Sequence, residues 1–147
     1  MRNINKKIAC IVAIIVLAMV LTACGDGAAK KLEQNVLDVI NSAYTAVKNE
    51  LSSIETKARE IEQDASAGIH TAIGKVKDEL ASVESAIAKE TQAGINEAKD
   101  LLANVKAELS TMKDTAQTLE GEAVDELHTL ITSLEEKIKE LENKLNI

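Results

Sequence analysis

The side chains best suited to chemistry in this sequence are two cysteines and two histidines. Cys10 and Cys24 both lie within the first 24 residues, and His70 and His128 are 58 residues apart. Neither histidine has a second histidine or a cysteine within four residues, the spacing that places two metal ligands on one helical face. Glu126 precedes His128 by two positions, so the two side chains point to different faces. We therefore expect both histidines to be solvated, and we expect no catalytic residue, no metal and no cofactor.

The charged residues give no sign of an enzyme or of a nucleic-acid-binding protein. The 24 acidic residues are spread along a polar face, and a single amphipathic helix has no cavity that would hold two carboxylates away from water. No glycine-rich loop follows a strand to bind phosphate. The net charge is -7 and the chain has one Tyr, no Phe and no Trp, whereas nucleic-acid binding needs clustered cations and stacking aromatic rings. We predict a non-catalytic protein with no nucleic-acid partner.

The first 24 residues are organised like a secretory signal. Residues 1–7 carry three basic side chains and no acidic one, residues 8–20 are apolar, and Leu21-Thr22-Ala23-Cys24 follows. This tetrapeptide resembles the lipobox of bacterial lipoproteins. The resemblance implies that residues 1–23 are removed by cleavage between Ala23 and Cys24, and that the Cys24 thiol receives a diacylglycerol, with palmitate as a typical acyl chain.

That resemblance implies a lipid anchor in the bacterial cell envelope, on the periplasmic or the extracellular face. Several acyl chains hold a protein stably on a membrane, whereas one chain does not. The alternative is an uncleaved membrane anchor, but residues 8–23 are shorter than the roughly 20 residues that a spanning helix needs. Cleavage would remove three basic residues and no acidic ones, leaving a net charge of -10. An anionic membrane surface would repel such a chain.

The rest of the chain reads as a flexible spacer followed by one amphipathic region. Residues 24–29 contain the lipidated cysteine and two glycines. Over residues 30–147, apolar side chains recur every three or four positions from Val36 to Leu145, and only Thr91 interrupts them. The mean step is about 3.6 residues, close to the period of an undistorted helix, and no period of two is sustained. The pattern predicts an all-α fold.

A 29-residue repeat underlies this apolar stripe. Its three copies begin at Val47, Val76 and Val105 and share the pattern Val-Lys-x-Glu-Leu. Because 29 residues at about 100° each return to within roughly 20° of the same direction, the copies share one face. We interpret the repeat as the duplication of a helical unit. The predicted helix-packing face comprises Val47, Leu51, Ile54, Val76, Leu80, Val83, Val105, Leu109 and Met112.

The C-terminal segment has the spacing of a coiled coil. Its apolar residues alternate steps of three and four, with isoleucine preceding leucine, a choice that favours two parallel strands. Glu142 flanks this seam, where it would face Lys137 of a parallel partner. Two heptads are too short to associate firmly, so the seam would assist self-association. The seam residues are Ile131, Leu134, Ile138, Leu141 and Leu145.

The glycines are the points at which the helical region could bend. A glycine inside a helix costs roughly 1 kcal/mol relative to alanine. The stripe nevertheless keeps its phase across Gly68, Gly94 and Gly121, which a loop has no reason to preserve. We therefore predict one long, nearly continuous amphipathic helix. A helical hairpin or bundle with bends near these three glycines is the alternative.

These features predict a structural or interaction protein that acts through helix–helix association. The design is broadly similar to the murein lipoprotein, although the last residues lack the terminal lysine that would join peptidoglycan. The resemblance implies self-association or binding to another envelope protein. One alternative is a surface-exposed lipoprotein whose bundle binds a ligand. Another is a lipid-interacting protein, because the periodicity is similar to that of the exchangeable apolipoproteins. Against the latter, Glu55 and Glu84 share one polar edge with Lys48, Lys77 and Lys106.

Overall fold

The computed structural model describes residues 31–147, which form four α-helices and, within that range, no β-strand. The helices are α2 (Gln34–Ala58), α3 (Gln63–Ile87), α4 (Gln92–Gln117) and α5 (Glu122–Leu145). The predicted all-α class is confirmed. The single long helix is wrong, because the chain turns back three times, and the bundle alternative describes the fold. The predicted signal, Cys24 and the spacer lie outside the described residues.

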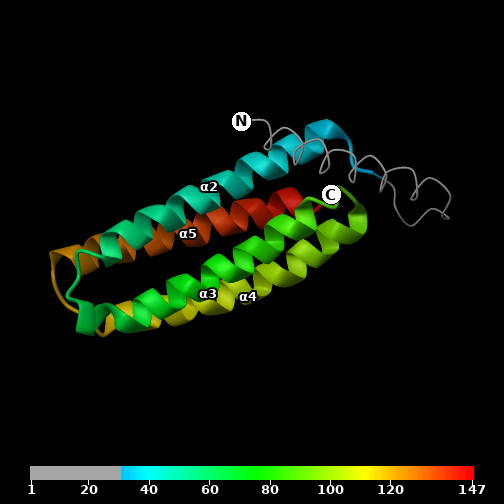
Figure 1. The fold of residues 1–147 in the computed structure, drawn as a ribbon. Helices are drawn as coiled ribbons and strands as arrows, with labels where there is room; N and C mark the ends of the chain where they lie inside the picture. The colour runs from blue at the N-terminus through cyan, green and yellow to red at the C-terminus, as the bar shows by residue number, and fades with distance from the viewer. Residues whose placement is uncertain (1–30) are drawn as a thin grey trace, which may run out of the picture. The chain divides into compact units, whose positions relative to one another are not determined.

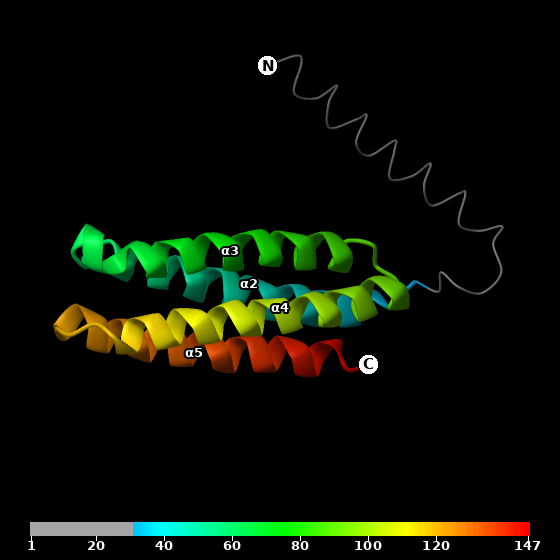
Figure 2. The ribbon, with the colours of Figure 1, turned by 90° about the horizontal axis from the view of Figure 1, so that it is seen from below.

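Residues 32–147 form one four-helix bundle in which successive helices run in opposite directions (Figure 1). Each helix packs against two neighbours in the cyclic order α2, α3, α4, α5, and the backbones of the diagonal pairs lie farther apart. Figure 2 shows the same arrangement from below. The α3–α4 and α2–α5 pairs pack most closely, and α2 and α3 approach each other least.

The two ends of the bundle differ in what they contain. The start of α2, the α3–α4 loop (residues 88–91) and the end of α5 lie together at one end, which we call the terminal end (Figure 1). The loops of residues 59–62 and 118–121 lie at the opposite end. The chain therefore continues toward its N-terminus from the terminal end.

The apolar stripe forms the core of this bundle. Its side chains point inward from all four helices, and thirty hydrophobic residues are at most 9% exposed. Tyr44 is the only aromatic residue among them. In residues 31–147, the large hydrophobic side chains that remain exposed are Val39 and Ile147. Aliphatic residues thus supply nearly all of the buried area, which is the main source of stability in a small domain.

The phase of the stripe is preserved because each 29-residue repeat consists of one helix and one loop. The helices begin at Gln34, Gln63, Gln92 and Glu122, and four residues separate each helix from the next. Helices of 24 to 26 residues joined by four-residue loops return each buried position to a similar place in the next helix. The periodicity that suggested an unbroken helix therefore arises from repeated units that fold back on one another.

The repeat extends to α5, although the polar residues of that helix no longer match the others. Leu134 lies 29 residues after Val105, and both are buried at equivalent positions. Seven of the eight buried positions of α2 have a buried counterpart in each later helix, and the exception is Ala43, whose counterparts Leu101 and Leu130 are partly buried. One counterpart is polar: Ser66 is fully buried where the other helices have an aliphatic residue, and its Oγ donates to the Gln63 carbonyl at 3.4 Å.

The first two bends fall before Gly68 and Gly94, and the third contains Gly121 as the sequence suggested. Gly68 lies inside α3 and Gly94 in the first turn of α4, whereas Gly121 ends the third loop with a φ of 124°. Thr91, the one interruption of the stripe, is the N-cap of α4, and its Oγ accepts a hydrogen bond from the Gly94 amide at 3.1 Å. A threonine cap satisfies a helix amide that otherwise lacks a partner.

Candidate functional site

The predicted helix-packing face lies entirely inside the bundle. All nine of its residues are at most 3% exposed, and they come from α2, α3 and α4. Packing within one chain therefore occupies the face that the sequence assigned to association. In the folded domain, this face offers no surface to a second protein or to lipid.

The C-terminal seam is occupied in the same way. Its five residues are at most 1% exposed, and α5 packs against α2 and α4 of its own chain. Both neighbours run antiparallel to α5. Glu142, which flanks the seam, accepts a hydrogen bond from Lys106 Nζ at 2.9 Å. The alternating Ile and Leu residues of α5 therefore pack against helices of the same chain and not against a second chain.

The most regular polar feature of the domain is a set of Lys–Glu pairs that cross between consecutive helices. Between α2 and α3, Lys48 Nζ lies 3.6 Å from Glu84 Oε1, and Lys77 forms an ion pair with Glu55. In this antiparallel pair, each helix provides one lysine and one glutamate. The hydrogen bond from Lys77 and the nearby Lys77 and Arg59 charges lower the pKa of Glu55 against a weaker opposing effect of burial.

The α4–α5 interface repeats this arrangement with a different distribution of charge. Lys106 pairs with Glu142 at 2.9 Å, and Lys113 Nζ lies 2.9 and 3.2 Å from the two oxygens of Glu135. Here α4 provides both lysines and α5 both glutamates. The sequence shows the charged residues of these pairs, because they recur seven positions apart on one face of each helix. It does not show which lysine pairs with which glutamate, because the pairing depends on where the loops lie.

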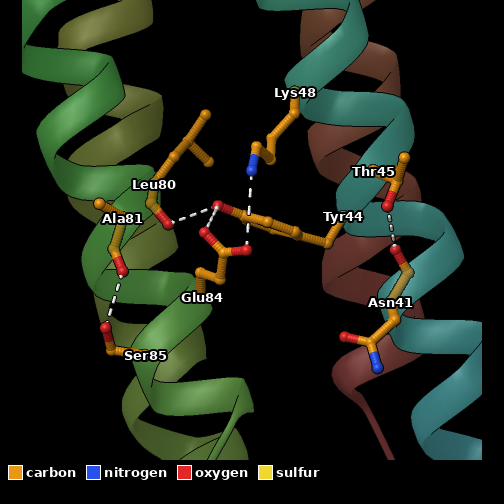
Figure 3. A network of polar contacts seen from close by, with 8 residues as sticks. All are labelled: Asn41, Tyr44, Thr45, Lys48, Leu80, Ala81, Glu84 and Ser85. Carbon is orange, nitrogen blue, oxygen red and sulfur yellow. Dashed lines mark hydrogen bonds and ion pairs between the residues drawn. The ribbon is translucent and has the colours of Figure 1, made fainter. Parts of the chain in front are cut away.

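Tyr44 connects the core to this polar edge (Figure 3). Its hydroxyl lies 2.8 Å from the Leu80 carbonyl oxygen and 3.3 Å from Glu84 Oε2. Lys48 Nζ lies 5.6 Å from the centre of the tyrosine ring, within cation–π range. Burial, and then the charge of Glu84, raise the pKa of Tyr44. The hydroxyl therefore remains protonated and donates across the α2–α3 interface, where the helices approach least.

Two shallow grooves follow the α2–α5 interface. The groove near the opposite end contains Lys57, which forms ion pairs with Glu60 and Glu126. These hydrogen bonds, that of Glu126 first, raise the pKa of Lys57 to about 12. The groove near the terminal end combines small side chains of α2 with charged side chains of α5. Its lining residues are Asp38, Val39, Ser42, Ala43, Ala46, Lys137, Glu140 and Lys144.

The two histidines do not form a site. His70 and His128 are half-buried on α3 and α5, which are diagonally opposite helices of the bundle. Within residues 31–147, no group of three or more His, Cys, Asp or Glu side chains is placed to hold a metal ion. The part of the chain that the structure describes also contains no helix long and apolar enough to cross a membrane. Ala23 and Cys24 lie outside it.

The geometry therefore describes a bundle whose apolar side chains are satisfied internally and whose outer face is polar. Its grooves along α2 and α5 are open, and the groove around Lys57 carries ion pairs. The chain matches no family model, no curated protein and no solved structure at a significant level.

Proposed function

We propose that this protein is a lipid-anchored lipoprotein of the bacterial cell envelope whose mature part is a non-catalytic, four-helix binding domain. The lipidated residue is Cys24, and the domain begins about ten residues later at Gln34. A lipid anchor, a short spacer and a domain with its own core together suit the display of a polar surface close to a membrane.

The observation that carries this proposal is the burial of most of the apolar stripe inside the bundle. A protein that associated through the stripe would leave much of it exposed, whereas this domain exposes only two large hydrophobic residues within residues 31–147. Recognition would then use polar and charged side chains on the outside of the helices. This favours a surface-displayed binding domain over a helix that assembles through its apolar face.

The charge distribution fits display away from an anionic bilayer. The end of the bundle opposite the termini is rich in carboxylates, and the chain continues toward Cys24 from the terminal end. Repulsion from an anionic membrane surface would direct the acidic end outward. Its acidic residues are Glu60, Glu62, Asp64, Asp114, Glu120, Glu122, Asp125 and Glu126, with Lys57, Arg59 and Lys113 as the basic ones.

The anchor is tested by expressing the full chain in a bacterium and labelling it with a palmitate analogue. We expect the wild-type chain and a Cys10→Ser variant to be labelled and to fractionate with membranes. A Cys24→Ser variant should lose both properties. If Cys24→Ser remains labelled, the lipid is attached elsewhere and the lipoprotein assignment fails.

The mode of action is tested with the unlipidated domain, residues 25–147, which contains the whole core. We expect it to remain in the aqueous fraction when floated with either zwitterionic or anionic liposomes. Flotation, accompanied by loss of the tertiary structure, would instead support the apolipoprotein-like alternative, in which the helices turn their apolar faces toward lipid.

A further inference from the structure

The loop between α3 and α4 has a composition that suits a helix better than a turn. It consists of residues 88–91 (Ala-Lys-Glu-Thr), with no glycine or proline. Glu90 has a φ of 53°, and it is the one non-glycine residue with a positive φ among residues 31–147. This left-handed conformation is unfavourable for residues with a Cβ atom, and Glu is a good helix former. The turn therefore imposes backbone strain on Glu90, and this strain would be relieved if the loop became helical.

The other two loops lack this strain. Gly121 takes the positive φ in residues 118–121, which glycine adopts without a steric penalty, and residues 59–62 have no positive φ. Strain at a short hinge is the condition that favours exchange of structural elements between copies of a protein. Only the α3–α4 loop meets that condition in the described part of the chain.

The buried faces of α3 and α4 would also remain aligned if this loop became helical. The two helices are offset by one 29-residue repeat, which returns to within roughly 20° of the same direction. Residues 63–117 would then form a single helix about 80 Å long with one continuous apolar face. Each half of this long helix could keep the packing partners it has in the bundle, but the two halves could no longer pack on each other.

We propose that two copies of this chain exchange hairpins by straightening residues 88–91. The α2–α3 hairpin of one copy would pack against the α4–α5 hairpin of the other, and two complete bundles would result. The pairs Lys48–Glu84 and Lys106–Glu142 lie within hairpins and would stay in one chain. The pair Lys75–Glu108, which crosses from α3 to α4, would form between chains. Each hairpin of the second copy would therefore pack on the same face that its own partner hairpin covers in the monomer.

Three interactions oppose the exchange and make it tunable. One is the ion pair between Lys89 and Glu97, which a continuous helix would separate. The Thr91 cap on the Gly94 amide exists only in the turn. The Leu32 amide donates to the Glu90 carbonyl at 3.0 Å, which ties the segment before α2 to the same loop. The balance between these bonds and the strain at Glu90 decides how much dimer forms. This inference concerns only residues 32–147, so it does not depend on the lipid anchor.

The first test measures the dimer fraction of residues 25–147 by light scattering after refolding at high concentration. We expect Thr91→Ala to raise the dimerisation constant by roughly 25-fold, because each of two lost caps is worth about fivefold. Glu90→Gly should lower it, since glycine relieves the turn and weakens the long helix. The control Glu60→Gly, in a loop without strain, should not lower dimerisation as Glu90→Gly does. An exclusively monomeric Thr91→Ala domain with native helix content would overturn the proposal.

The second test shows whether a dimer is exchanged. In the dimer fraction of the Lys75→Cys/Glu108→Cys variant, a short thiol-reactive cross-linker should join two chains on a denaturing gel. The matched variant Lys106→Cys/Glu142→Cys carries its pair within one hairpin, so its dimer should give single chains. Residues 25–147 have no other cysteine. Single chains from both variants would show that the copies associate without exchange, and the proposal would fail.

Discussion

Lys48 on α2 faces Glu84 on α3 across the same sequence separation, 36 residues, that lies between Lys106 on α4 and Glu142 on α5. The second pair of each interface is also equivalent, since Glu55 and Lys77 are related to Lys113 and Glu135 by 58 residues, with the charges reversed. The bundle is therefore two copies of one helical hairpin. The reversal concentrates positive charge on this edge of α4 and negative charge on the facing edge of α5.

The first prediction concerns this charge reversal. Lys113→Glu would place two carboxylates opposite each other, because Lys113 Nζ contacts both oxygens of Glu135. We expect the free energy of unfolding of residues 25–147 to fall by about 1 kcal/mol, the upper range for an exposed pair. The double variant Lys113→Glu/Glu135→Lys should recover most of that loss. Urea denaturation of the four proteins of this cycle gives the coupling energy.

Lys99→Glu is the matched control for this cycle. It makes the same charge change on α4, but no ion pair of Lys99 is present among residues 31–147 and no charged residue lies three or four positions away. We expect it to change the free energy of unfolding by less than Lys113→Glu does, and Glu135→Lys should not rescue it. Equal effects of the two lysine variants would mean that overall charge, and not the pair with Glu135, determines the stability.

The sequence predicted the helical class and the buried side of each helix. Aliphatic residues at a 3.6-residue period lie on a single face of a helix, and this is the face that must be buried. It did not predict where the helices end. The loop of residues 59–62 (Arg-Glu-Ile-Glu) contains no turn-forming residue, and Ile61 continues the apolar spacing. Only tertiary packing selects a turn there, because an extended helix would leave the whole stripe in water.

Thr91 shows which local signal was informative. A polar residue that interrupts an apolar stripe, and is followed by a helix, is an N-cap signature.

The Ile–Leu pattern of α5 was misleading. Antiparallel neighbours in a bundle bury the same three- and four-residue spacing as a parallel dimer does, so Ile131 and Leu134 could not distinguish a partner chain from the chain itself. The Lys–Glu pairs were unpredictable because their register depends on loop lengths.

The second prediction concerns the hydroxyl of Tyr44. Tyr44→Phe removes the hydrogen bond to the Leu80 carbonyl, and we expect the free energy of unfolding at pH 7 to fall by about 1 kcal/mol. Tyr44→Ala should cost about 3 kcal/mol or more, because it also leaves a cavity. Urea denaturation of both variants separates the polar contribution from the packing contribution. Equal losses of stability for the two variants would contradict the prediction that the ring contributes more than the hydroxyl.

The pKa of Tyr44 adds a pH dependence with a definite sign. The folded protein raises this pKa above its ordinary value of 10, so the neutral hydroxyl contributes stability that is fully present below pH 10 and is lost at higher pH. We therefore expect the wild-type domain to lose more stability than Tyr44→Phe does as the pH rises from about 10 to about 12. Absorbance at the tyrosinate band should show no ionisation until the domain unfolds.

The third prediction concerns Glu55. Lys77 lowers the pKa of this carboxyl below its ordinary value of 4.5, so the ionised form contributes stability above that value, and the contribution is lost as the pH falls. Glu55→Gln should therefore be less stable than the wild-type domain at pH 7, and the difference should vanish toward pH 3. The measurement is urea denaturation at both pH values. A difference that does not change with pH would indicate a packing effect instead of the ion pair.

The fourth prediction compares two glycines of equal helical propensity in different surroundings. An added Cβ at Gly74, in the middle of α3, meets no atom within 4 Å, so Gly74→Ala should raise the free energy of unfolding by about 0.5–1 kcal/mol. At Gly94 the same Cβ would collide with the Ala86 carbonyl oxygen and lie 2.9 Å from Lys89 Cβ. Both neighbours belong to the end of α3 and the loop that follows it, and the backbone carbonyl cannot move without disturbing the Thr91 turn. Gly94→Ala should therefore lower the midpoint of thermal unfolding although it improves helix propensity. A higher midpoint for both variants would mean that α3 and α4 do not meet as closely at this turn as the bundle requires.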